Sequence, residues 1–169
     1  FVPVQKVAGG DHVLTVTSAG KAWNLAGFKA GLIIAGRQTR GLFTKLPPFT
    51  LHAAGHLGDL AHTAALRHAQ PWVDQLMVEI GANRELLADL LADEVPAARY
   101  QPQPGTYLAW VDCTELGFDD PARQFLDVGR VAFSAGAAFG AEHATWVRIN
   151  LACSPELLTE AVDRMASST

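Results

Sequence analysis

The sequence has few cysteines, no long apolar run and no excess of basic residues. Cys113 and Cys153 are the only cysteines in 169 residues, and neither sits in a Cys-x-x-Cys or zinc-type spacing. We therefore expect no disulfide framework and a reducing, cytoplasmic location. No run approaches the roughly 20 apolar residues that span a bilayer, and no basic-then-apolar signal segment is evident. The net charge of -4 gives no electrostatic reason to expect nucleic acid or a membrane as a partner.

The remaining composition is globular, with 49% hydrophobic and 18% charged residues. A chain of this length can bury a sizeable core as one domain or two small ones. Its first residue is Phe1 rather than Met, which suggests that the chain comes from a larger protein, called the parent protein below.

Two short apolar runs near the start predict strands. Residues 13–16 are rich in β-branched side chains, and residues 31–35 are apolar and bounded by glycines. Residues 37–48 are predicted to be a loop, because Pro47 and Pro48 block a helix.

The middle of the chain has helical spacing. Apolar residues recur at positions 57, 60, 61, 64 and 65, and Pro71 can occupy the first turn of a long second helix that Pro96 ends. Further strands are predicted over residues 106–111, 131–133 and 146–151, with helices beginning at Asp120-Pro121 and Ser154-Pro155.

Strands at both ends and helices between them predict an α/β fold. We expect residues 1–70 to be the end of an α/β domain, residues 71–96 to be a linking helix, and residues 97–169 to form a compact α+β domain.

The segment with the most chemical information is residues 18–31, Ser-Ala-Gly-Lys-Ala-Trp-Asn-Leu-Ala-Gly-Phe-Lys-Ala-Gly. Lys21 follows a strand that we expect to be buried, and partial burial would favour the neutral amine that attacks an aldehyde. Ser18 and Lys29 could both contact an anion such as phosphate. Taken alone, the pattern is more typical of a solvated lysine in a glycine-rich turn.

This segment resembles the lysine motif of the class I and II aminotransferases, and it is most similar to the cystathionine β-lyase-like (C–S lyase) branch. The resemblance implies that Lys21 forms a Schiff base with pyridoxal 5′-phosphate (PLP). It also implies that Ser18 and Lys29 contact the phosphate of that cofactor. Many members have Arg at the position of Lys29, and an ammonium lacks the bidentate geometry of a guanidinium.

A second match lies in residues 146–153, Trp-Val-Arg-Ile-Asn-Leu-Ala-Cys. On a strand, Arg148 and Asn150 project to the face opposite their apolar neighbours. An arginine on a rigid strand is suited to bidentate binding of a carboxylate, although this segment taken alone is more typical of an arginine on a solvent face. The resemblance implies that Arg148 binds the substrate α-carboxylate, and we assign Asn24 to the same group.

The resemblance covers nearly the whole chain and implies the C-terminal part of a fold type I PLP-dependent transferase. Residues 1–70 would then end the large PLP-binding domain, and residues 97–169 would be the small domain. It further implies an aminotransferase or C–S β-lyase that acts on an amino-acid substrate as a homodimer. The remaining cofactor-binding groups of the family lie upstream of the lysine, so we expect a missing N-terminal half and an inactive isolated chain. The alternative is the ligand-sensing domain of a transcription regulator.

Two other patterns do not support a site. Ser18-x-x-Lys21 also occurs in β-lactamases, but the Lys-Thr-Gly and Ser-x-Asn elements that accompany it there are absent. His52, His56, His62 and His68 lack the glutamate of a zincin motif, so no metal is expected. We expect these histidines to lie at a helix start and on a solvated face.

Overall fold

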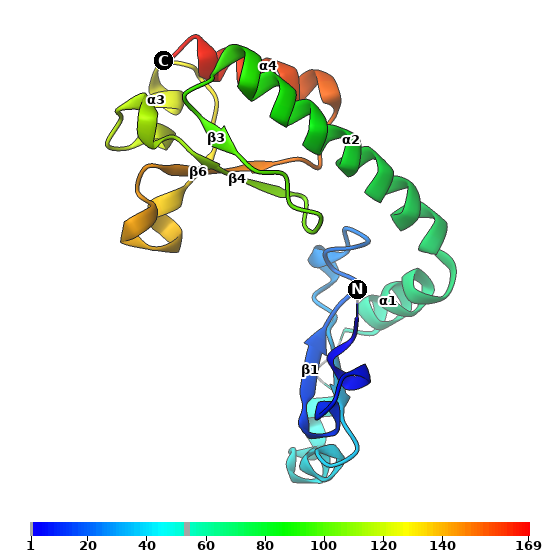
Figure 1. Ribbon diagram of the computed structural model, residues 1–169. Coiled ribbons are helices and arrows are strands. Elements are labelled where there is room, and N and C mark those ends of the chain that lie inside the picture. The colour runs from blue at the N-terminus through cyan, green and yellow to red at the C-terminus, as the bar shows by residue number, and fades with distance from the viewer. Residues whose placement is uncertain (1, 53–54) are drawn as a thin grey trace. The chain divides into compact units, whose positions relative to one another are not determined.

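The computed structural model describes residues 2–52 and 55–169, apart from the side chains of residues 51 and 52 (Figure 1). The chain divides into two compact units, Phe1–Gln75 and Leu76–Thr169. The division falls within the long helix α2 (Gln70–Glu94). In the described part of the chain, no helix is both long enough and apolar enough to cross a membrane.

The first unit contains a two-stranded antiparallel sheet. β1 (Leu14–Thr17) pairs with β2 (Leu32–Ala35), with Leu14 opposite Ala35 and Thr17 opposite Leu32. Both predicted strands are therefore confirmed, each starting one residue later than expected. The segment between them carries the lysine motif and includes a 3-10 helix at Ala26–Phe28.

The strands of the first unit are largely exposed. The prediction that β1 is buried is therefore wrong. Val16 is 76% exposed and Ile33 is 49% exposed. A two-stranded sheet is buried only where other elements pack on its faces, and no described element of this unit covers these two side chains. The segment predicted as a loop contains two 3-10 helices, Arg40–Lys45 and Pro48–His52.

Helix α1 (His56–His68) follows, close to its predicted start. Its buried residues are Gly58, His62 and Ala65, whereas Leu57 is 71% exposed. A Cβ atom at Gly58 would lie 2.7 Å from the carbonyl oxygen of Phe28. The small side of α1 therefore packs against the lysine motif. Of the apolar stripe that defined the helix in the sequence, Leu57 and Leu60 are exposed, whereas Ala65 is buried.

The second unit is built on a four-stranded antiparallel sheet in the order β3-β4-β6-β5. Its strands are β3 (Arg99–Tyr100), β4 (Leu108–Asp112), β6 (Trp146–Asn150) and β5 (Ser134–Ala135). The strand predicted over residues 131–133 is wrong, because pairing with β6 begins only at Ser134.

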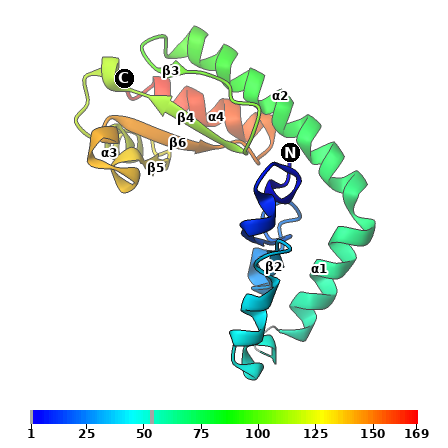
Figure 2. The same ribbon diagram turned by 60° about the horizontal axis from the view of Figure 1, so that its bottom comes forward.

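Three helices complete the second unit. The later part of α2 and helix α4 (Pro155–Ala166) run over the same face of the sheet (Figures 1 and 2). Helix α3 (Pro121–Asp127) begins as predicted, with the Arg123 N–H donating to Oδ1 of Asp120 at 3.0 Å. The Leu157 N–H donates to Oγ of Ser154 in the same way at the start of α4. Side-chain caps of this kind satisfy amide groups that have no partner within the helix.

One buried apolar cluster joins these elements. Its largest members come from helices α2, α3 and α4 and from strands β4 and β6 with the residue after β6. Each is less than 2% exposed: Phe125, Leu87, Leu91, Leu151, Leu158, Met165, Val111, Val147 and Val162. Burial of each such side chain contributes about 1.5–3 kcal/mol. This cluster holds β6, and therefore Arg148, in a rigid sheet.

Candidate active site

Lys21 lies in a hydrogen-bonded turn just beyond β1. The Trp23 N–H donates to the Ala19 carbonyl at 3.0 Å, and the Gly20 N–H donates to Oγ of Ser18 at 3.1 Å. The Lys21 side chain is exposed. The expectation that it is partly buried is therefore wrong. Among the described residues, none forms an ion pair or hydrogen bond with its amine.

Helix α1 fastens this turn at both ends. The Ala19 N–H donates to Nε2 of His62 at 3.1 Å, and the indole N–H of Trp23 donates to the Ala69 carbonyl at 2.9 Å. The sequence analysis placed His62 on a solvated face, but its side chain is only 8% exposed. A signal for the burial of His62 was present in the sequence. Gly58 and Ala65 lie on the same side of the helix as His62, and small residues let a helix approach another segment closely.

Asn24 and Lys29 share an unusual backbone conformation. Their φ angles are 54° and 55°, in the left-handed region that non-glycine residues rarely adopt. In the described part of the first unit, they are the only non-glycine residues with positive φ. Backbone strain of this kind gathers at functional sites. Both residues, with Ser18 and Lys21, lie on the single segment that joins β1 to β2.

Arg148 projects from the sheet face opposite the core, as predicted. Along β6, Val147 and Ile149 are buried, whereas Arg148 is half-buried. The guanidinium carbon lies 4.5 Å from the centre of the Phe139 ring, a cation–π contact, and Nη2 donates to Oγ of Ser134 at 3.3 Å. These two contacts orient the guanidinium and leave most of its N–H groups available.

The position of Phe139 depends on a close approach of backbone at Gly136. A Cβ atom there would collide with the carbonyl oxygens of His143 and Trp146. Glycine thus lets the 3-10 helix Gly136–Phe139 lie against β6 and carry its phenyl ring to Arg148. The Trp110 ring meets Phe139 edge-on at 5.5 Å and stacks on Trp146 at 5.6 Å.

The end of β6 is held by Asn83, which is buried in α2. Its side-chain amide donates to the carbonyl oxygens of Leu151 at 2.9 Å and Cys153 at 2.8 Å. The chain beyond Arg148 is thereby fixed to the helical layer. Sequence reasoning did not single out Asn83, because a polar residue inside an apolar helical stripe gives no sign of its partner.

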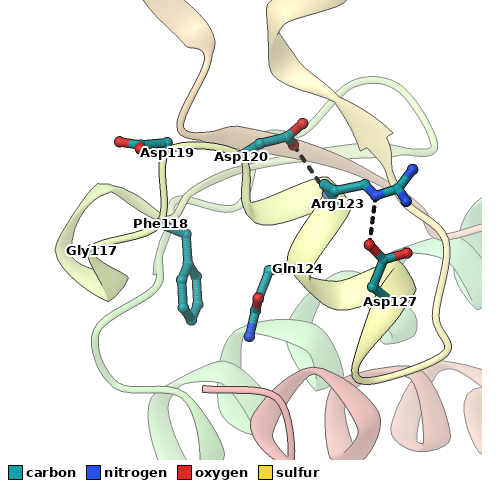
Figure 3. Close-up of a pocket in the computed structure, with 7 residues that line it drawn as sticks. All are labelled: Gly117, Phe118, Asp119, Asp120, Arg123, Gln124 and Asp127. Atoms are coloured by element: carbon teal, nitrogen blue, oxygen red, sulfur yellow. Dashed lines mark hydrogen bonds and ion pairs between the residues drawn. The ribbon is translucent and has the colours of Figure 1, made fainter.

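A shallow hollow of about 290 Å³ lies beside α3, and none of the predicted site residues lines it (Figure 3). Its carboxylates are mostly engaged: Asp120 caps α3, and Asp127 pairs with Arg123 at 2.6 Å. Asp119 points away from Asp120 (Figure 3). Within residues 2–52 and 55–169, no group of three or more His, Cys, Asp or Glu side chains is placed to hold a metal ion. The side chain of His52 lies outside the described residues.

The family model described as aminotransferase class I and II matches residues 1–165. The chain belongs to this family. Its relatives include a Mycobacterium tuberculosis protein named, provisionally, a cystathionine β-lyase. That protein is 44% identical over 99% of this chain and 46% of its own length. The cystathionine β-lyase of Corynebacterium glutamicum is 30% identical over 91% of this chain and 42% of its own.

Solved structures agree with this assignment. The crystal structure of a Corynebacterium diphtheriae protein, provisionally named a PLP-dependent β-cystathionase, is 32% identical with a TM-score of 0.90. It matches 99% of this chain and 45% of its own. The predicted fold class, that of the fold type I PLP-dependent enzymes, is confirmed. The chain spans about half the length of the curated relatives it matches.

Proposed function

We propose that this chain is the C-terminal part of a PLP-dependent enzyme that acts on amino acids, with Lys21 as the residue that holds the cofactor. The observation that carries the proposal is the free amine of Lys21 on a turn that α1 fastens at Ala19 and Trp23. Family membership and the names of the relatives support the reaction class.

The residues of the lysine segment fit PLP. Its flat ring and phosphate require a nucleophilic amine, small neighbours and groups that bind an anion. Lys21 is exposed beside Gly20 and Ala22, and a Cβ atom at Gly27 would meet open space. Ser18 and Lys29 supply a hydroxyl and an ammonium for the phosphate. When bound, PLP supplies an electron sink for the charge that develops at the substrate Cα.

We assign a separate role to each of three side chains, Lys21, Arg148 and Asn24. Nζ of Lys21 would hold the cofactor and would accept the Cα proton of the substrate. Arg148 binds the substrate α-carboxylate, and its contacts with Phe139 and Ser134 limit the guanidinium to few orientations. Asn24 contributes a second donor to the same carboxylate.

Among the possible reactions, we propose carbon–sulfur β-lysis. In this outcome the Cβ–S bond of the substrate breaks, a thiol leaves, and hydrolysis of the remaining imine gives pyruvate and ammonia. Transamination would use the same residues, with Lys21 returning the proton; hydrolysis would then release a keto acid and leave the amino group on the cofactor. The names of the relatives at 44% and 30% identity favour the lyase. Because these relatives are named as enzymes, the ligand-sensing regulator gains no support.

The parent protein supplies the other groups that hold the cofactor. We propose that residues 1–70 belong to its large domain, that residues 71–96 are the linking helix, and that residues 97–169 are its small domain. We also propose that it works as a homodimer in the cytoplasm. The isolated chain is then inactive and develops no imine absorbance band when PLP is added.

The test is mass spectrometry of the parent protein after incubation with PLP and borohydride reduction. We expect an adduct on the peptide that contains Lys21, and its loss in Lys21→Ala. Lys6→Ala, which removes another exposed lysine of the same unit, should leave the adduct in place. An adduct that maps to a different lysine, or none at all, would refute the assignment.

A further inference from the structure

We infer that His62 is a positioning residue that sets the place of Lys21 by accepting a hydrogen bond from the Ala19 amide. The inference rests on the proposed function of Lys21. Nε2 of His62 lies 3.1 Å from the Ala19 nitrogen, and both residues are buried, at 8% and 1% exposure. The two residues are 43 positions apart in the sequence, so this bond ties the turn to a separate helix.

The Ala19 amide needs this acceptor because the sheet does not provide one. Pairing between β1 and β2 ends at Thr17, and Ala19 lies beyond the last paired residue. A buried N–H group without a partner destabilises the folded state. Among the described residues, His62 is the acceptor that satisfies it.

The bond between Ala19 and His62 fixes the backbone two residues before Lys21. The carbonyl of Ala19 accepts from the Trp23 N–H, which closes the turn around Lys21. With its amide held by His62, Ala19 is fixed on both sides of its α-carbon. The Lys21 backbone follows two residues later and cannot shift freely. Displacement of a reacting group by about 1 Å can slow a reaction by about 100-fold.

Histidine supplies a specific chemistry at this position. An Nε2 atom that accepts a hydrogen bond carries no proton, so the imidazole hydrogen is on Nδ1. Phenylalanine would fill the same space without an acceptor. Glutamine would place an amide oxygen about as far from Cα as Nε2 and keep the acceptor. These two substitutions therefore separate packing from hydrogen bonding.

The first measurement is hydrogen exchange of the Ala19 amide in the parent protein, followed in a peptide that covers residues 14–21. We expect protection in the wild type, exchange faster by about tenfold or more in His62→Phe, and restored protection in His62→Gln. His68→Phe changes an exposed histidine of the same helix and should have no effect. Unchanged exchange in His62→Phe would show that the bond is absent and would overturn the inference.

The second measurement is the rate at which PLP is captured on Lys21, read by borohydride trapping. We expect His62→Phe to slow capture about tenfold and His62→Gln to recover most of the rate. Capture at the wild-type rate in a His62→Phe protein with faster Ala19 exchange would reduce His62 to a packing role. If His62→Phe does not fold, His62→Gln decides, since slow capture in a stably folded glutamine variant overturns the inference.

Failure of the proposed function is distinguishable from failure of this inference. If the wild type forms no adduct at Lys21, the cofactor assignment is wrong, whereas Ala19 exchange still reports on the bond to His62. If the wild type forms the adduct and His62→Phe forms it equally fast, the function stands and the positioning role falls.

Discussion

The two units of the chain differ in how far they bury their apolar residues. In the second unit, α2, α3, α4 and the sheet share one buried cluster, with Phe125, Leu87 and Val111 fully excluded from solvent. In the described part of the first unit, Ala19 and Ala65 are the only buried hydrophobic residues. The first unit instead relies on backbone hydrogen bonds and on close contacts such as the one at Gly58.

This difference indicates where the chain carries its own stability. The second unit contains enough interlocking apolar side chains to hold a specific structure. The first unit has strands and a fastened turn, but its larger apolar side chains lack cover. We therefore expect the segment around Lys21 to depend on surfaces that the parent protein supplies. We expect strand β6, which carries Arg148, to be formed by this chain alone.

The largest expected effect is at Phe125, whose ring packs edge-on against Phe133 at 5.7 Å in the second unit. Phe125→Ala should lower the free energy of unfolding by about 3–5 kcal/mol, because it leaves a cavity in the core. Urea titration of the chain measures this loss. Phe49→Ala, at a site that is 73% exposed in the first unit, should change it by less than about 0.5 kcal/mol. Similar losses at both positions would remove the contrast between the units.

A second test compares the core of the second unit with its margin. Burial, with a smaller contribution from Asp112, raises the pKa of the Cys113 thiol to about 12, and burial also raises the pKa of Cys153. Near pH 8, Cys113 should therefore react with iodoacetamide about 1000-fold more slowly than an unfolded thiol. Half-buried Cys153 should react at an intermediate rate. Peptide mapping after timed alkylation measures both rates, and faster labelling of Cys113 would contradict the buried core.

The raised pKa of the Cys113 thiol also determines how stability changes with pH. Because the folded-state pKa of Cys113 is raised above its ordinary value of 9.0, the folded protein retains its proton longer than the unfolded chain. This contribution to stability is complete below about pH 9 and is lost as the pH rises toward 12. Unfolding midpoints measured between these values should fall in the wild type and fall less in Cys113→Ala.

Much of this arrangement could be predicted from local pattern alone. The alternation along residues 146–151 placed Arg148 opposite the core, and capping residues located the starts of α3 and α4. The two-residue strand β3 could not be predicted, since only its pairing with β4 makes it a strand. The apolar pattern found only Ala65 of the buried side of α1 and missed Gly58 and His62, because contact with the lysine segment decides which side is buried. The same contact explains why His62 was not recognised.

A smaller effect is expected at Asn83, the polar bridge between α2 and the end of β6. Asn83→Leu removes both donors and leaves the Leu151 and Cys153 carbonyls without them. We expect a loss of about 2–3 kcal/mol in the free energy of unfolding. Increased exchange of amides in residues 151–153 should accompany it. A loss as small as that of an exposed substitution would mean that solvent replaces both bonds.

The smallest effect on stability is expected on the exposed sheet of the first unit, where Val16 is 76% exposed. Both strands of this sheet are edges, and an uncovered apolar sheet associates readily with another copy. We expect the isolated chain to self-associate and Val16→Lys to reduce that association, with the free energy of unfolding changed by less than about 0.5 kcal/mol. Val78→Lys is the matched control, because Val78 is 73% exposed but lies on helix α2. Light scattering of the three proteins separates the cases. Monomeric wild type would show that the first unit needs no cover, and an equal effect of both substitutions would show that the sheet is not the associating surface.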